Sequence, residues 1–176
     1  MVSKNVNRNQ EINKEKKEPP KNRRFEKIKE AIQKEKTMSE YLIVKRLQRV
    51  ETFIGSFPSD EIPKCSSFPS FFVLNTDKST QKGTHWLAIR EDENLIEVYD
   101  SLNLKNYPDS IKSYLSSKPI RKIRKIQPNK SFLCGLYSCF FILYRQSHSF
   151  SATLSKFSRK LSVNDEILFS ELNKIW

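Results

Sequence analysis

The chain has 176 residues and a formal net charge of +12, from 32 Lys and Arg against 20 Asp and Glu. No apolar run approaches the ~20 residues of a membrane span. No signal-peptide core follows Met1 either, so the sequence predicts a soluble, intracellular protein. Three cysteines without close pairs argue against a disulfide framework, and one domain is enough to account for this length.

The basic charge is concentrated at the start of the chain. Residues 1–50 hold 15 Lys or Arg against 7 Asp or Glu, and residues 1–24 contain almost no large apolar side chains. Such a segment buries too little surface to offset its ordering entropy. We therefore predict a basic, disordered extension over 1–37, with a weak polar helix over 25–36, before a domain over 38–176. The extension serves nuclear import, DNA contact or solubility, and charge alone does not choose among them.

Alternating helix and strand patterns predict an α+β domain. A helix begins near Thr37 or Ser39, where Thr37 and Glu40 have capping-box spacing, and it runs to Val50. Gly55, Pro58 and Pro63 then break the pattern. The strands expected next cover 71–75, 85–90, 95–100 and 120–127, and helices follow over 134–147 and from Ser162 to Ile175.

The stretch "QPNKSFLCGLYSCFFILY", residues 127–144, places Cys134 at the start of an apolar helix. The free N–H groups and the positive dipole end of a helix N-terminus favour a thiolate. Gly135 is expected to leave room for a substrate. Cys134 is therefore the candidate nucleophile, whereas Cys65 and Cys139 are interpreted as small buried apolar residues.

A thiolate nucleophile needs a base, and the chain has two histidines. His148 follows Cys134 by 14 residues, which along one helix is about 21 Å. His85 therefore remains as the candidate base.

A carboxylate that orients the imidazole is expected in the hairpin formed by 85–90 and 95–100. If Arg90 lies opposite Leu95, His85 lies opposite Asp100, with Cβ atoms about 5 Å apart on one face. Asp100 would then hold the imidazole as triads require. Taken singly, each residue has an ordinary alternative, a structural strand histidine and a turn aspartate. Gln127 is a candidate donor to an oxyanion, with a plain surface residue as the alternative.

Three segments resemble the adenovirus-type cysteine proteases (adenain): "GTHWLAI", "EVYDSLN" and "QPNKSFLCGLYSCFFILY". The wider superfamily includes the proteases that cleave SUMO. The resemblance covers about residues 38–176 and keeps the order His, acid, Cys. It implies a papain-like α+β fold, with a central mixed sheet packed between helices and the catalytic Cys at the N-terminus of a core helix. It makes His85 the base, Asp100 its orienter, Gln127 an oxyanion-hole donor and Cys134 the nucleophile, and it packs Trp86 beside the site.

The sequence differs from adenain in two ways, so it does not decide between the adenain branch and the SUMO-protease branch of the superfamily. Adenain has Glu where this chain has Asp100, whereas the SUMO proteases have Asp, and the segment between Asp100 and Cys134 is shorter than in adenain. The resemblance therefore fits a trimmed enzyme from an adeno-like virus or a Maverick/Polinton-type transposon. It implies cleavage of capsid or core precursors at Gly-containing sites, in a virion or a host nucleus.

Adenain-like enzymes also slide on DNA, and the run "KPIRKIRKIQPNK" is a candidate for such contacts. Its cations are Lys118, Arg121, Lys122, Arg124, Lys125 and Lys130; the alternative is a solvated strand face. The chemistry requires no cofactor, although DNA or a peptide is a candidate activator. We expect a monomer that acts on protein substrates without a membrane.

Other functions stay open. They are a SUMO or ubiquitin isopeptidase, an acetyl transferase on the same scaffold, and a basic DNA-binding virion protein without catalysis. A zinc site is rejected, since Cys134 and Cys139 do not share a helix face and no Cys-x-x-Cys occurs.

Overall fold

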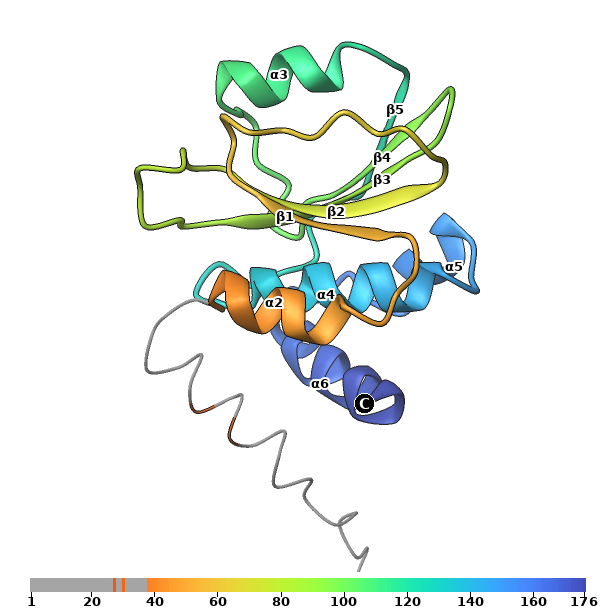
Figure 1. Cartoon of the computed structure of the whole chain (residues 1–176). Helices are drawn as coiled ribbons and strands as arrows, with labels where there is room; N and C mark the ends of the chain where they lie inside the picture. The colour runs from red at the N-terminus through yellow and green to blue at the C-terminus, as the bar shows by residue number, and fades with distance from the viewer. Residues whose placement is uncertain (1–26, 28–29, 31–37) are drawn as a thin grey trace, which may run out of the picture.

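The computed structural model describes residues 27, 30 and 38–176 (Figure 1). The predicted extension over 1–37 and its polar helix lie outside the described residues, apart from Lys27 and Glu30, and so does the capping role of Thr37. In the described part of the chain, no helix combines the length and the hydropathy that crossing a bilayer requires.

A five-stranded mixed sheet forms the centre of the fold. Its strands lie in sequence order, and the outer pairs β1–β2 and β4–β5 are parallel while the inner pairs are antiparallel. The strands are β1 (Phe53–Phe57), β2 (Ser70–Asn75), β3 (Trp86–Glu91), β4 (Ile96–Tyr99) and β5 (Ile120–Lys122).

Helices cover both faces of the sheet, as Figure 1 shows, with α3 on one side and α2, α4 and α6 on the other. The bounds are α2 (Glu40–Leu47), α3 (Asp109–Leu115), α4 (Cys134–Arg145), α5 (Phe150–Ser155) and α6 (Asn164–Ile175), with a 3-10 turn at Leu161–Val163. The predicted α+β class and its mixed sheet between helices are therefore present.

Successive side chains of a strand point to opposite faces of the sheet. Since helices cover both faces, both sets of side chains on the inner strands are buried. Phe72, Leu87 and Val98 belong to the core beneath α3, whereas Phe71 and Ala88 belong to the larger core beneath α4. Every residue of β2 is buried as a result. The inner strands, which carry the candidate site at their ends, are thus fixed from above and below.

Several predicted boundaries need correction. Strand 120–127 stops at Lys122, because only three residues pair with β4, and Ile123 and Ile126 instead turn into the core. The sequence patterns did not predict strand β1. It contains Gly55, with φ +139°, and a glycine beside prolines is typical of a break between elements rather than of a strand. The sequence patterns also missed α3 and α5.

The predicted register of the hairpin is wrong by two residues. Ala88 pairs with Tyr99 and Arg90 with Glu97, so continuing the ladder places Asp100 opposite Leu87 rather than His85. Because side chains alternate with a period of two, a shift of two keeps His85 and Asp100 on one face as diagonal neighbours. A shift of one would have separated them.

Candidate active site

Cys134 is the first residue of α4, as the sequence predicts. The first turn of the helix is closed by a hydrogen bond of 2.9 Å from Tyr137 N to Leu133 O. The Cys134 side chain is nearly enclosed, with 4% of the residue exposed. It therefore lies where the unpaired N–H groups of the first helical turn favour negative charge.

Gly135, directly after Cys134, leaves space that another part of the protein occupies. A Cβ on Gly135 would lie 2.7 Å from Met38 Cβ, closer than side-chain carbons approach one another. The expectation that this space admits a substrate is therefore corrected, since Met38 fills it. Met38 is in turn held by Trp86, whose Nε1 donates to the Met38 carbonyl at 2.9 Å. Trp86 thus fixes the chain just before α2 against the start of α4.

His85 and Asp100 form a buried pair at the ends of β3 and β4. The distance from His85 Nε2 to Asp100 Oδ1 is 2.8 Å, and the two residues are 5% and 0% exposed. The other Asp100 oxygen accepts from Leu104 N at 2.7 Å and from the Tyr107 hydroxyl at 2.6 Å. Asp100 Oδ1 also accepts from the backbone N–H groups of residues 102 and 103, both at 3.1 Å. These four contacts orient the Asp100 carboxylate independently of its hydrogen bond with the imidazole.

The electrostatics of this pair favour its charged form. Burial opposes the charge on His85, but the hydrogen bond to Asp100 and the adjacent Cys134 side chain outweigh it and raise the pKa of His85 to about 9. Burial likewise opposes the charge on Asp100, but the contacts with His85, Tyr107 and Leu104 lower its pKa to about 2. Asp100 and Cys134 both stabilise the protonated form of His85. A neighbouring imidazolium is also what stabilises a cysteine thiolate in general.

The second ring nitrogen of His85 is left available. Nδ1 is buried and has no hydrogen-bond partner among the described residues. Since Asp100 occupies Nε2, Nδ1 is the ring nitrogen left for the adjacent Cys134, whose side chain helps to raise the pKa of His85. A buried nitrogen without a hydrogen-bond partner is unusual in a folded protein, and a role in the chemistry of a site is one explanation for it.

Gln127 is buried rather than on the surface, with 1% of the residue exposed. Its Oε1 accepts from the Ser101 hydroxyl at 2.5 Å, and its Nε2 donates to Ser131 O at 2.8 Å. A primary amide has two N–H donors, so a second one stays available on Nε2. The interpretation of Gln127 as a plain surface residue is thus wrong.

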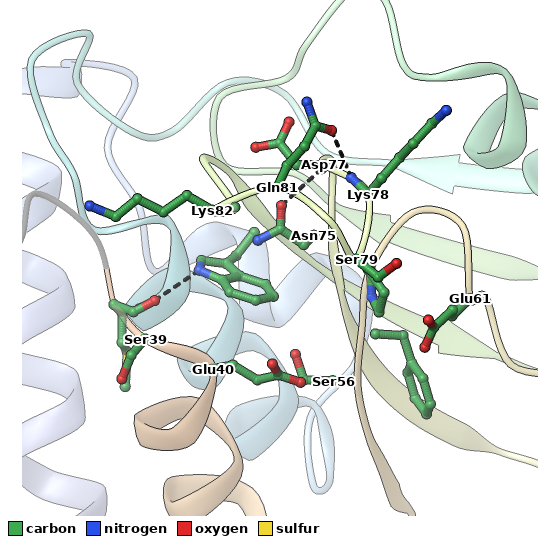
Figure 2. Close-up of a pocket in the computed structure, with 15 residues that line it drawn as sticks. Ser39, Glu40, Ser56, Glu61, Asn75, Asp77, Lys78, Ser79, Gln81 and Lys82 are labelled. Carbon is green, nitrogen blue, oxygen red and sulfur yellow. Dashed lines mark hydrogen bonds between the residues drawn. The ribbon is translucent and has the colours of Figure 1, made fainter.

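A cavity of about 560 Å³ adjoins this region. Met38 and Trp86 line it, together with Gly83 and the end of β1, so it lies against the same wall that packs on Gly135. Figure 2 shows Glu40 and Ser56 at one end and Gln81 and Lys82 at the other. The cavity has both apolar and charged walls, and none of His85, Gln127 and Cys134 is among the residues that line it.

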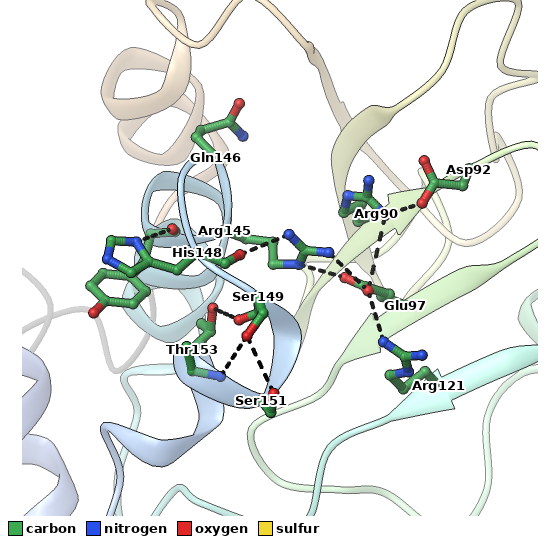
Figure 3. A network of polar contacts seen from close by, with 12 residues as sticks. Arg90, Asp92, Glu97, Arg121, Arg145, Gln146, His148, Ser149, Ser151 and Thr153 are labelled. Atoms are coloured by element: carbon green, nitrogen blue, oxygen red, sulfur yellow. Dashed lines mark hydrogen bonds and ion pairs between the residues drawn. The ribbon is translucent and has the colours of Figure 1, made fainter.

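Most of the predicted DNA-binding cations have partners within the protein. Lys118 binds Glu91 at 2.7 Å, Lys122 donates to Leu104 O at 2.8 Å, and Arg124 donates to Phe157 O at 2.7 Å. Lys125 bonds to the side chain of Asn129. Arg121 is 3.6 Å from the buried Glu97 (Figure 3), and half of its side chain is exposed. These contacts weaken the case for phosphate binding without testing it.

The other sulfur and imidazole groups are separate from the pair. His148 is exposed and stacks on Tyr144, with ring centroids 3.7 Å apart beyond the far end of α4. Cys139 is fully buried as predicted, whereas Cys65 is only half-buried. Burial raises the pKa of Cys65 to about 11 and that of Cys139 to about 12. No group of three metal-binding side chains occurs among the described residues.

Sequence reasoning missed Ser101, Tyr107 and Met38. The "DSLN" turn was available as a signal, since an Asp side chain that caps the following N–H groups is a common turn. Nothing local indicated that Tyr107 would turn back to Asp100 or that Met38 would reach Gly135, because both contacts depend on the fold.

A scan against models of known protein families finds no match, and a search of curated proteins finds no relative. The family assignment therefore depends on the three sequence segments given above.

Proposed function

We propose that the protein is a cysteine endopeptidase of the adenain-like type, with His85, Asp100 and Cys134 as its triad. The observation that carries this is the unpartnered Nδ1 of a buried His85, whose Nε2 is held by Asp100 and whose pKa is raised in part by Cys134. A structural histidine would have both nitrogens satisfied or exposed.

The geometry suggests the following steps. Because the pKa of His85 is raised to about 9, its imidazole already holds the proton at Nδ1 as an imidazolium, and the sulfur of Cys134 attacks as a thiolate on the carbonyl carbon of the peptide bond to be cleaved. The oxyanion that forms accepts from the Cys134 backbone N–H and from the remaining donor of Gln127 Nε2. His85 gives its proton to the leaving amine, and water then hydrolyses the thioester, with His85 as base.

The cavity beside Trp86 would take the residues on the acyl side of the cleaved bond. We propose capsid or core precursors with Gly-containing cleavage sites as substrates, in a virion or a host nucleus. The chemistry needs no cofactor, while activation by DNA or a peptide is part of the proposal. The enzyme would act as a monomer.

The test is cleavage of a mixed peptide library, read by mass spectrometry, with the wild-type protein and Cys134→Ala side by side. We expect cuts at Gly-containing motifs that disappear in the variant, with a loss of at least about 10⁴-fold. Parallel reactions with double-stranded DNA test activation. Absence of every cut would overturn the endopeptidase in this form.

An isopeptidase for SUMO or ubiquitin-like proteins is the second candidate, favoured by Asp100 in the place of Glu. An electrophilic SUMO probe separates the two, because only the isopeptidase would be labelled efficiently at Cys134. Turnover of acetyl-CoA would instead reveal a transferase. A basic DNA-binding protein without catalysis would leave both assays unchanged by Cys134→Ala, and the occupied cations described above weigh against it.

A further inference from the structure

Ser101 holds Gln127 in two ways. Its hydroxyl donates to Gln127 Oε1 at 2.5 Å, and its carbonyl accepts from the backbone N–H groups of Ile126 at 3.0 Å and Gln127 at 2.9 Å. Ser101 is 1% exposed, so these bonds do not compete with bulk water. Main chain and side chain of Gln127 are therefore tied to one residue.

The environment also decides which end of the Gln127 amide faces which neighbour. Ser131 O can only accept, so it requires the nitrogen of the amide on its side. The oxygen then faces Ser101, whose hydroxyl must donate. A flipped amide would bring two acceptor oxygens together at Ser131. Removing the Ser101 hydroxyl would leave Gln127 Oε1 buried without a donor.

Ser101 follows Asp100 directly, in the turn after β4. Asp100 pairs with His85, and Ser101 donates to Gln127. One dipeptide after β4 thus fixes the base and the oxyanion donor at once.

We propose that Ser101 is a positioning residue, which holds the Gln127 amide so that its free N–H meets the oxyanion. This inference rests on the proposed acyl-transfer function. An oxyanion donor lowers the barrier only if it is oriented before the charge develops. Ser101 would act through Gln127 alone and would not change the nucleophile.

The experiment is a double-mutant cycle of Ser101→Ala and Gln127→Ala, with the library peptide that the wild-type protein cuts fastest. We expect Gln127→Ala to lower kcat by about 10²-fold and Ser101→Ala by about 10-fold, with little change in KM. In the Gln127→Ala background, Ser101→Ala should change kcat by less than about 2-fold.

Alkylation of Cys134 by iodoacetamide is the control for the nucleophile. Its rate should be unchanged in Ser101→Ala, because Cys134, His85 and Asp100 stay in place. An equal loss of kcat in both backgrounds, or no loss in either, would overturn the positioning role. If Ser101→Ala does not fold, Ser101→Cys, with a similar size and a weaker donor, replaces it.

A failure of the proposed function gives a different result. Wild-type protein would then cut no peptide of the library, and the positioning role would fall with the function. A wild-type enzyme that is active and loses its activity in Cys134→Ala leaves the cycle as the test of Ser101 alone.

Discussion

Strand β4 and the residue after it present two buried carboxylates with contrasting surroundings. Glu97 is 1% exposed and faces three guanidinium groups, with Arg145 at 2.9 Å, Arg121 at 3.6 Å and Arg90 at 3.9 Å (Figure 3). Asp100 is fully buried and faces backbone N–H groups, a tyrosine hydroxyl, one imidazole and, at 3.8 Å, the ammonium of Lys122. The first carboxylate has only partners of fixed charge.

The two clusters differ in whether a partner of the carboxylate has a ring nitrogen left unpaired. The partners of Glu97 are all guanidinium groups, which bind carboxylates through fixed N–H donors. The Asp100 group includes an imidazole whose second nitrogen is still available. Burial of an acid is therefore no argument for a functional site by itself, and the proposal for Asp100 depends on its imidazole partner.

The largest expected effect is that of Asp100→Asn on catalysis. Asparagine keeps the size of the side chain but does not stabilise an imidazolium, so we expect kcat to fall by about 10³- to 10⁴-fold. The measurement is peptide cleavage, with circular dichroism as the control for folding. A loss below tenfold would remove Asp100 from the triad.

Glu97→Gln should affect stability instead. It leaves three arginines beside a neutral amide, and breaking a buried ion pair costs about 3 kcal/mol. Urea denaturation should show this loss, while kcat per folded molecule stays at the wild-type value. A comparable loss of kcat would mean that the two carboxylates do not have separate roles.

Above neutral pH, the pH dependence of the free energy of unfolding should come from the titration of His85. Folding raises the pKa of His85 from 6.5 to about 9, so its contribution is complete below pH 6.5 and is lost as the pH rises through 9. Asp100, with its pKa lowered to about 2, contributes above pH 3.8 and loses that contribution as the pH falls through 2.

The free energy of unfolding should therefore decrease between pH 6.5 and 9, by about 3 kcal/mol at roughly 1.4 kcal/mol per pKa unit. Thermal unfolding over this range tests it, with His85→Gln as the control that lacks the decrease. A parallel decrease in the variant would assign it to another group.

The smallest effects compare two neighbouring cations of β5. Lys122 Nζ lies 3.8 Å from Asp100 Oδ2, and Arg121 lies beside Glu97. We expect Lys122→Gln to lower kcat about 2- to 5-fold by changing the field at Asp100. The more exposed Arg121→Gln should change stability by less than about 1 kcal/mol and leave kcat unaltered.

Fluorescence anisotropy with double-stranded DNA tests the same pair as phosphate contacts. A true contact would reduce the slope of log affinity against log salt by about 1 in each variant. Unchanged slopes would leave both cations with internal roles alone.

The sequence predicted the positions of Cys134, His85 and Asp100 in the fold better than their surroundings. Cys134 at a helix start and one reachable histidine follow from local spacing, and alternation along a hairpin kept His85 and Asp100 on one face even though the register was wrong. The contacts of Ser101 with Gln127 and of Met38 with Gly135 span 26 and 97 residues, so no local pattern contains them. The internal partners of the basic run also depend on tertiary structure, which is why charge alone suggested DNA.

The three thiols differ enough to serve as a built-in set of chemical labels. Cys139 is enclosed, and Cys65 has a pKa of about 11, so at neutral pH neither is a good nucleophile. If Cys134 is the nucleophile proposed above, a fluorophore or photocrosslinker carried by a mild electrophile would attach there through the 4% of the residue that is exposed. A labelled reporter of this kind would follow occupancy of the site directly, with no need for a cysteine-free background.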